Sequence, residues 1–220
     1  MSINIAIDGP VASGKGAVTK GLSKKLGIPA LDTGAIYRAV TLFLLDNEID
    51  IHDEKKILMS LNKISVRLYL AENHDLRVFT QGQDVTPRIR ENRVSLAVPV
   101  VAAYVGVRDY VNRQIALVAS QGNYILEGRD IGTVVLPNAD YKFFLTASLE
   151  VRAKRRKADL DAKGEEYSLL EVMAQVKERD EQDMNRAIAP LRQAPDAIYI
   201  DNSNLTLEQT IDTLAKYIKL

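Results

Sequence analysis

The sequence predicts an α/β fold in which helices cover a parallel sheet. Two observations carry this prediction. Strand-like and helix-like patterns alternate through most of the 220 residues, as they do in β-α-β units. The first strand pattern, Ile3–Ile7, is apolar at nearly every position, which is typical of a strand buried on both faces. Because 46% of the residues are hydrophobic, the chain can form one substantial core with small insertions.

The other regular elements follow from hydrophobic spacing. Val18, Leu22 and Leu26 recur at helical spacing before Gly27, a residue type that commonly ends helices. We expect further strands at residues 29–31, 124–127, 142–146 and 197–200. We expect further helices at residues 36–45, 107–120, 149–162, 169–186 and 207–218.

One region departs from this alternation. Residues 64–70 and 76–79 alternate between polar and apolar with period two, and the turn-like Glu72–Asp75 separates them. Gly82 and Asp84 mark another turn. The pattern predicts a small antiparallel β insertion in the α/β core. This insertion is either a substrate-binding arm or a hairpin without a function of its own.

The segment Gly9–Gly16 joins the first strand to the first helix. Its pattern, G-x-x-x-x-G-K, binds phosphate when it lies between a buried strand and a helix. Glycines let N–H groups converge on phosphate oxygens, the helix dipole adds positive potential, and Lys15 adds a mobile charge. The alternative is a glycine-rich turn with an exposed lysine, which the strand-loop-helix order disfavours. Gly16 stands where a hydroxyl residue often binds magnesium, so Mg²⁺ would depend on nucleotide phosphates, waters and a carboxylate.

The segment Asp32–Arg38 follows the second predicted strand. Ligands of open α/β sheets bind beyond the carboxyl ends of the strands. Asp32 or Thr33 would cap the next helix, and Arg38 could reach an anion bound near the start of that helix. The alternative is a helix cap followed by a surface arginine.

The segment Glu127–Gly132 places charge at the end of another apolar strand pattern. Its glycines allow a close approach of the backbone to a ligand. Arg129 suits a phosphate or carbonyl group, and the adjacent Asp130 suits a base. The alternative is a local turn held by a salt bridge.

Five of the seven residues in Val151–Lys157 are basic. Such a run forms a solvated helix face, an electrostatic patch for nucleic acid, or a mobile lid whose arginines close over a polyphosphate. In the lid interpretation, Gly164–Glu166 would be its tip. The sequence does not decide between these interpretations.

The helix expected at residues 169–186 changes character along one face. Val172 and Val176 lie on that face, and Arg179, Asp183 and Arg186 continue the same row. Because unpaired buried charge is costly, an inward face that becomes ionic needs partners. We therefore expect this end of the helix to line a polar cleft. The alternative is an i,i+4 Arg–Asp pair on a surface helix.

Composition excludes several classes of function. Lys plus Arg and Asp plus Glu both number 29, which argues against broad nucleic-acid binding. The chain has no cysteine, so disulfides and thiolate chemistry are excluded. The longest apolar stretch, Ala97–Val105, is broken by Pro99 and is too short for a membrane span. His52 and His74 are isolated, so we expect both on the surface and predict no metal-binding residues.

Together these residues resemble the bacterial cytidylate kinase family, within the nucleoside monophosphate kinase-like P-loop proteins. The two middle segments are the most specific to that family, and the matches run in order through nearly the whole chain. The matching segments are Asp8–Pro10 with Gly14–Gly16, Asp32–Arg38, Gly128–Val135, and Lys177–Asp180 with Asp183, Asn185–Arg186 and Ala189–Leu191.

The resemblance implies a three-layer P-loop fold with a parallel sheet flanked by helices. It also implies a small antiparallel β insertion and a helical lid. Residues 1–220 would be a single kinase core, with an inserted nucleoside monophosphate-binding arm at 62–98 and the lid at 152–167. The implied reaction moves the γ-phosphoryl group of ATP, with Mg²⁺, to CMP or dCMP. These small molecules would be the only partners of a cytoplasmic monomer that binds neither nucleic acid nor membranes.

The resemblance also assigns residues. Arg38 and Arg129 would hold the acceptor phosphate, Arg108 and Asp130 would read the cytosine edge, and Asp183 with Arg179 would contact the ribose hydroxyls. Thr33 and Tyr37 are further substrate-binding residues. The catalytic residues would be Lys15, Arg186, Arg152 and Arg156. ATP would be held by Gly9, Pro10, Val11, Ala12, Ser13, Gly14, Lys15, Gly16 and Ala17.

Two other functions remain open at this point. One is a different small-molecule P-loop kinase that acts on UMP, dTMP, shikimate or a coenzyme precursor. The other is a nucleotide-binding regulatory or RNA-interacting protein that uses the basic segment. The neutral net charge and the ionic face of the helix at 169–186 disfavour the second alternative.

Overall fold

The computed structural model describes residues 3–70, 76–120 and 122–219. The chain forms two compact units. The first unit contains Ile3–Ile28 and Ile125–Leu220, and the second contains Pro29–Tyr124.

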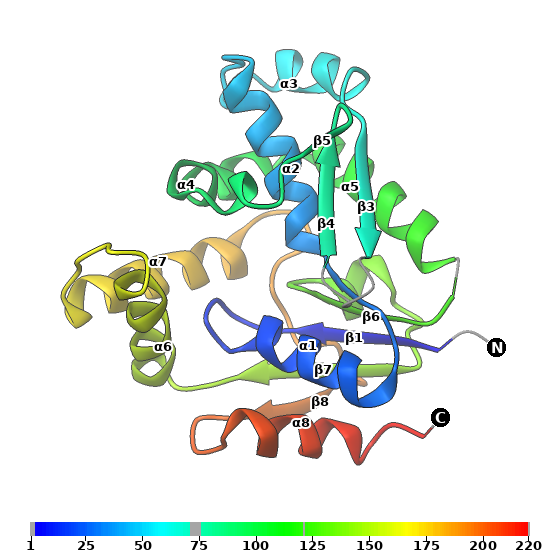
Figure 1. Cartoon of the computed structure of the whole chain (residues 1–220), viewed down its shortest axis with the longest axis vertical. Helices are drawn as coiled ribbons and strands as arrows, with labels where there is room; N and C mark the ends of the chain where they lie inside the picture. Colours follow the sequence, from blue (N-terminus) through cyan, green and yellow to red (C-terminus); the bar gives the residue numbers. More distant parts are fainter. Residues whose placement is uncertain (1–2, 71–75, 121, 220) are drawn as a thin grey trace. The chain divides into compact units, whose positions relative to one another are not determined.

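Strands and helices alternate as the sequence predicts (Figure 1). The strands are β1 (Asn4–Asp8), β2 (Ala30–Asp32), β3 (Val66–Leu70), β4 (Leu76–Thr80), β5 (Gln83–Asp84), β6 (Tyr124–Gly128), β7 (Tyr141–Thr146) and β8 (Ile198–Asp201). The α-helices are α1 (Lys15–Leu26), α2 (Thr33–Asp46), α3 (Glu54–Leu61), α4 (Asn92–Val101), α5 (Val105–Ala119), α6 (Leu149–Asp161), α7 (Leu169–Asn185) and α8 (Leu207–Ala215). A 3₁₀ turn, η1 (Arg88–Arg90), and a π-helical turn, η2 (Ile131–Val135), complete the set.

The expected strands and helices are present, with ends that differ by a few residues. The sequence does not predict α3, α4, η1, η2 or β5, and Asp84, which was expected in a turn, belongs to β5. Helix α4 contains Pro99, and a proline predicts an interruption because it breaks the hydrogen-bond pattern inside helices. The expected turn at Glu72–Asp75, with His74, lies outside the described residues, and His52 is exposed.

The larger sheet has five parallel strands in the order β2-β6-β1-β7-β8. In its register, Ile5 lies opposite Tyr141 and Asp8 opposite Phe144. Helices α1 and α8 pack against each other beside this sheet. The core there is a cluster of buried apolar side chains from β1, α1, β7, β8 and α8: Ile5, Ile7, Val18, Leu22, Phe143, Leu145, Ile200 and Leu214.

Helices α6 and α7 form a second apolar cluster in the first unit, built on Ala153, Leu160, Val172 and Val176. Helix α7 begins with a capping box in which Ser168 and Glu171 satisfy each other's backbone groups. This arrangement removes two unpaired donors at the helix start. The cap and the apolar cluster together fix the rotation of α7 about its axis, and with it the direction of the charged side chains at its other end.

The second unit contains a three-stranded antiparallel sheet in the order β3-β4-β5. Val66 pairs with Thr80 and Leu68 with Val78, which confirms the antiparallel insertion. Helix α2 packs on α4, η1 and β4.

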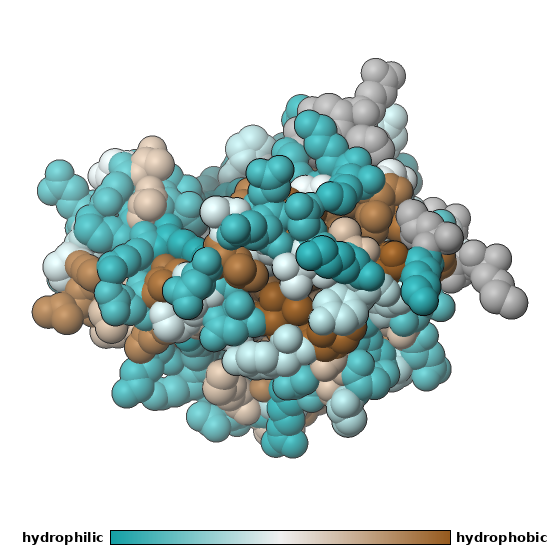
Figure 2. Space-filling model, turned by 90° about the horizontal axis from the view of Figure 1, so that it is seen from below, coloured by the Kyte–Doolittle hydropathy of each residue, from teal (hydrophilic) through white to brown (hydrophobic). Residues whose placement is uncertain are grey.

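The face seen in Figure 2 is mostly hydrophilic, with patches of hydrophobic surface between polar side chains. Among the described residues, no single helix is long and apolar enough to cross a membrane. The pair Asn92–Val101 and Val105–Ala119 reaches the required length and composition only together, across a bend of 107°.

Candidate functional site

The loop between β1 and α1 has the curled backbone of a phosphate cradle. Ala12 has a φ of 57° and Gly14 a φ of 88°, so left-handed residues alternate with ordinary ones and N–H groups can converge. Gly9 has a φ of 154°, and a Cβ there would lie 2.0 Å from the carbonyl oxygen of Leu145. No other residue type fits at position 9 without moving β7, so the first glycine of the motif is a steric requirement.

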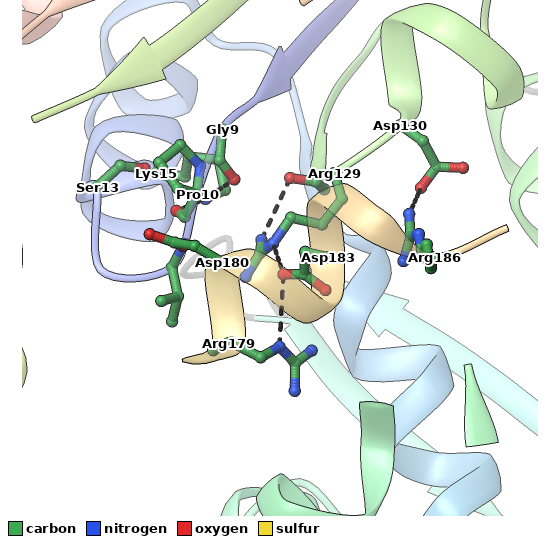
Figure 3. Close-up of polar contacts among 12 residues, drawn as sticks. Gly9, Pro10, Ser13, Lys15, Arg129, Asp130, Arg179, Asp180, Asp183 and Arg186 are labelled. Atoms are coloured by element: carbon green, nitrogen blue, oxygen red, sulfur yellow. Dashed lines mark hydrogen bonds and ion pairs between the residues drawn. The ribbon is translucent and has the colours of Figure 1, made fainter. Parts of the chain in front are cut away.

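Lys15 is folded back into this loop (Figure 3). Its Nζ donates to the carbonyl oxygens of Gly9 at 2.8 Å and Pro10 at 2.7 Å, and to Ser13 Oγ at 3.2 Å. Burial, together with the positive charge of Arg129, lowers the pKa of Lys15 from 10.5 to about 7. The loop therefore holds a lysine whose charged form lacks a full counter-charge, and an anion entering the cradle would supply one.

Asp8, the last residue of β1, ties this strand to the turn after β6. Its carboxylate accepts hydrogen bonds from the N–H groups of Ile131 at 2.8 Å and Gly132 at 2.7 Å. Burial raises the pKa of Asp8 from 3.8 to about 6, although both hydrogen bonds act in the opposite direction. The sequence reading assigned no role to Asp8, but an acidic residue directly after a buried apolar strand was an available signal.

Asp183 of α7 sits between two arginines. Arg129 Nε donates to Asp183 Oδ2 at 2.8 Å, and Arg179 Nε approaches the same oxygen at 3.4 Å. Burial alone would raise the pKa of Asp183, but the charges of Arg129 and Arg179 outweigh it and hold the pKa below its usual value. The cluster contains two guanidinium groups and one carboxylate, so it presents positive charge.

A second ionic contact joins Arg186, at the end of α7, to the turn after β6. Arg186 Nη2 donates to Asp130 Oδ1 at 3.1 Å, and its Nε donates to the carbonyl oxygen of Ala189 at 2.6 Å. The expected change of α7 from an apolar to an ionic inner face is confirmed, because Val172 and Val176 are buried and Arg179, Asp183 and Arg186 have partners. The i,i+4 Arg–Asp pair of the alternative is also present, as one part of this cluster. The polar cleft itself stays a prediction.

The basic stretch of α6 divides into distinct environments. Lys154 and Lys157 form exposed i,i+4 pairs with Glu150 and Asp161. Arg152 is buried and donates to Asp180 Oδ2 at 2.5 Å. Arg155 is partly buried and contacts Asn202. Arg156 is partly exposed and forms no hydrogen bond or ion pair within the described part of the chain.

The remaining candidates lie in the second unit. Arg38 of α2 donates to Ser95 Oγ at 2.9 Å. Arg108 of α5 is buried, with its guanidinium carbon 5.6 Å from the centroid of the Tyr37 ring, a cation–π distance. Thr33 is buried at the first position of α2. Asp32 occupies the N-cap position, but its side chain forms no capping hydrogen bond and lies 3.6 Å from Arg90 Nη2 instead. Asp32 is therefore the N-cap residue by position, as one of the two expected alternatives, but without a capping hydrogen bond from its side chain.

Magnesium would have to be held largely by groups outside the protein. Among the described residues, no group of three or more His, Cys, Asp and Glu side chains could hold a metal ion. However, Glu127 Oε1 lies 3.4 Å from the position that a Cβ of Gly16 would occupy. A carboxylate therefore lies beside Gly16, the position at which this motif often carries a hydroxyl residue. This donor set fits a hydrated Mg²⁺ bound to phosphates, because carboxylate and water oxygens suit that ion.

Comparison with known proteins places this chain in a family. The cytidylate kinase family model matches residues 5–220. The chain belongs to the cytidylate kinase family. It is 45% identical to the cytidylate kinase of Caldicellulosiruptor bescii, over 95% of this chain and 92% of that protein. It is 43% identical to the cytidylate kinase of Carboxydothermus hydrogenoformans, over 98% of this chain and 97% of that protein. Membership makes the chain an ATP-dependent nucleoside monophosphate kinase.

Solved structures agree on the fold of this cytidylate kinase family member. The shikimate kinase of Bacteroides thetaiotaomicron superposes with a TM-score of 0.50 at 16% identity, with all of both chains covered. An uncharacterized protein from Eubacterium ventriosum gives a TM-score of 0.55 at 13% identity, over 98% of each chain. At these identities the likeness supports the P-loop kinase fold alone.

The expected cytidylate kinase residues fall into both units. The first unit brings together the phosphate loop, Lys15, Arg129, Asp130, Arg179, Asp183 and Arg186, and it also contains Arg152 and Arg156. The second unit contains Thr33, Tyr37, Arg38 and Arg108. Asp8 and Asp180 are buried acids beside the phosphate loop that the sequence reading left without a role.

Proposed function

We propose that this chain transfers the γ-phosphoryl group of ATP to CMP or dCMP, which gives ADP and CDP or dCDP in pyrimidine nucleotide metabolism. One observation carries the proposal at the level of residues. Lys15 is held inside the phosphate loop, and Arg129, bound to Asp183 at 2.8 Å, lies in the same region (Figure 3), where its charge helps to lower the pKa of the lysine. Two such cations in one site are suited to two phosphate groups that approach each other.

The donor nucleotide binds at the loop Gly9–Ala17. Lys15 leaves its contacts with Gly9, Pro10 and Ser13 and binds the β- and γ-phosphates of ATP, while the loop N–H groups bind the remaining oxygens. Glu127 would hold hydrated Mg²⁺. When bound, Mg²⁺ neutralises charge on the transferring phosphoryl group.

The acceptor nucleotide binds through arginines and acids. Arg38 and Arg129 bind its phosphate, since the planar guanidinium matches phosphate oxygens. Arg108 and Asp130 read the cytosine edge. Asp183, oriented by Arg179, binds the ribose hydroxyls, and Thr33 and Tyr37 complete the acceptor site.

The transfer step needs no general base. A phosphate oxygen of the acceptor is already anionic at neutral pH, and it attacks the γ-phosphorus while the bond from that phosphorus to the β–γ bridging oxygen breaks. ADP leaves with the electron pair of that bond. Arg186 and the lid residue Arg156 stabilise the charge on the transferring group. Arg152 is the other arginine expected at the transferring group, but its pair with Asp180 favours a role behind the phosphate loop. Closure of the lid, residues 152–167, excludes water.

We further propose a cytoplasmic monomer whose partners are small-molecule nucleotides, without nucleic-acid or membrane binding. These statements rest on the neutral net charge and on the family. Sedimentation of the purified protein with and without RNA tests the oligomeric state and the absence of an RNA complex.

The function is tested by ADP formation from ATP and Mg²⁺ with CMP, dCMP, UMP, AMP, dTMP and shikimate supplied separately. We expect rapid turnover with CMP and dCMP only. Turnover with another acceptor would keep the kinase fold but overturn the roles of Arg108 and Asp130. ATP binding without turnover on any acceptor would favour a regulatory nucleotide-binding protein.

A further inference from the structure

Side chains behind the phosphate loop hold the loop by its backbone. Asp180 Oδ1 accepts a hydrogen bond from the N–H of Val11 at 3.3 Å. Arg152 Nη1 donates to the carbonyl oxygen of the same residue at 3.2 Å. Arg152 and Asp180 are both buried and paired with each other, so one ion pair holds both polar backbone groups of Val11.

A second pair holds Ser13 in the same way. Asn202, which follows β8, donates from Nδ2 to the carbonyl oxygen of Ser13 at 3.0 Å, and Arg155 Nη1 donates to that oxygen at 3.3 Å. Arg155 also binds the Oδ1 of Asn202 at 3.0 Å and its backbone oxygen at 3.1 Å. Asn202 is buried, and its own N–H donates to the carbonyl of Thr146.

These contacts determine which way the peptide groups of the loop face. In a planar trans peptide, the C=O of one residue and the N–H of the next point in opposite directions. The carbonyls of Val11 and Ser13 face the guanidinium groups, so the N–H groups of Ala12 and Gly14 are directed away from them. The peptide before Val11 follows the same rule, because its N–H binds Asp180 and its carbonyl, that of Pro10, binds Lys15.

The backbone at Ala12 and Gly14, which follow Val11 and Ser13, shows why such support is needed. Ala12 has a φ of 57° and Gly14 a φ of 88°. A left-handed alanine costs energy that the surroundings must offset. Hydrogen bonds on both sides of Ala12 supply that support.

We propose that Arg152, Asp180, Arg155 and Asn202 form a brace that orients the N–H groups of the phosphate loop for the phosphates of ATP. The proposal rests on the proposed function, in which this loop binds ATP. The four are positioning residues: they act through the loop backbone, and Arg155 and Asn202 need not touch the nucleotide. Part of the basic stretch of α6 thereby acquires a role other than closing over the substrate.

The test compares Asn202→Ala with Asn204→Ala, because Asn204 is exposed and only two residues away. Binding of ATP and of inorganic tripolyphosphate is measured by calorimetry on the full chain, and thermal unfolding checks that both variants are folded. Loss of the brace weakens both ligands by about tenfold in Asn202→Ala, and Asn204→Ala matches the wild type. The KM for ATP rises and the KM for CMP does not.

Two results would overturn the brace. If Asn202→Ala weakens ATP but not tripolyphosphate, Asn202 contacts the adenosine moiety. If the binding of neither ligand is weakened, the loop holds its shape without Asn202. Failure of the wild type to bind ATP would instead reject the proposed function.

Asp180→Asn adds a test that depends on whether the affinity for an anion rises or falls. Removal of a negative charge near the site should strengthen the binding of an anion if only electrostatics mattered. The brace requires the reverse, a weaker affinity for tripolyphosphate, because Arg152 loses its partner. Stronger binding in Asp180→Asn would contradict the proposal.

Discussion

Binding of ATP should draw a proton onto Lys15. The pKa of Lys15 is lowered from 10.5 to about 7, by burial and by the neighbouring Arg129. Phosphates in the cradle supply the missing counter-charge and restore the protonated form. If the pKa returns to near its usual value, the protein takes up ~0.9 proton per ATP at pH 8 and ~0.5 at pH 7.

Calorimetry detects this proton directly, because the binding enthalpy then depends on the ionisation enthalpy of the buffer. The titration is best performed at pH 8, where the terminal phosphate of ATP is already ionised and releases little proton of its own. Lys15→Met, titrated at higher ligand concentration, is the control and should show no uptake. A binding enthalpy at pH 8 that is the same in all buffers would refute the reasoning about the charge of Lys15.

Three further predictions concern the acids and arginines of the site. The pKa of Asp8 in the folded protein is about 6, raised from 3.8. Its contribution to the free energy of unfolding is therefore complete below pH ~3.8 and is lost as the pH rises through ~6. The free energy of unfolding falls by about 3 kcal/mol across this range. Asp8→Asn should lack this loss, and parallel curves of unfolding free energy against pH for both proteins would contradict it. Arg186→Ala should lower kcat on the order of 10²-fold or more with little change in the KM for CMP; a near-normal kcat in steady-state assays would exclude the role. Asp183→Ala should narrow the gap in kcat/KM between CMP and dCMP, because a contact with the 2′-hydroxyl is lost, and unchanged discrimination would count against that placement.

The elements that sequence predicts best here are those whose signal is local. The phosphate loop can be predicted from the sequence because its glycines and Lys15 must lie at fixed separations between a strand and a helix. The ionic row of α7 was visible because Val172 and Val176 define the buried face before Arg179 begins. Helix α4 was hidden by Pro99, since a proline in the last turns of a helix looks like its end in a linear pattern.

The roles of Asp180 and Arg155 show where sequence reasoning stops. Asp180 lies four residues after Val176, on the same face, and extending that row would have found it. Its partner Arg152, however, comes from α6, and no spacing in the sequence indicates that pair. Within α6 the basic residues look alike in one dimension. They differ only because Arg155 faces Asn202 and the phosphate loop while Lys154 faces Glu150 on the surface.

Helix α7 uses a single helical register for two purposes, since its first half is packed into the core and its second half presents Arg179, Asp183 and Arg186. Each residue turns an α-helix by about 100°. One residue gained or lost after Val176 would therefore rotate all three charged side chains off their partners at once, whereas a substitution affects one of them. A single-residue insertion or deletion in the second half of α7 should therefore disturb the site more than one in the connection at residues 162–168, between α6 and α7.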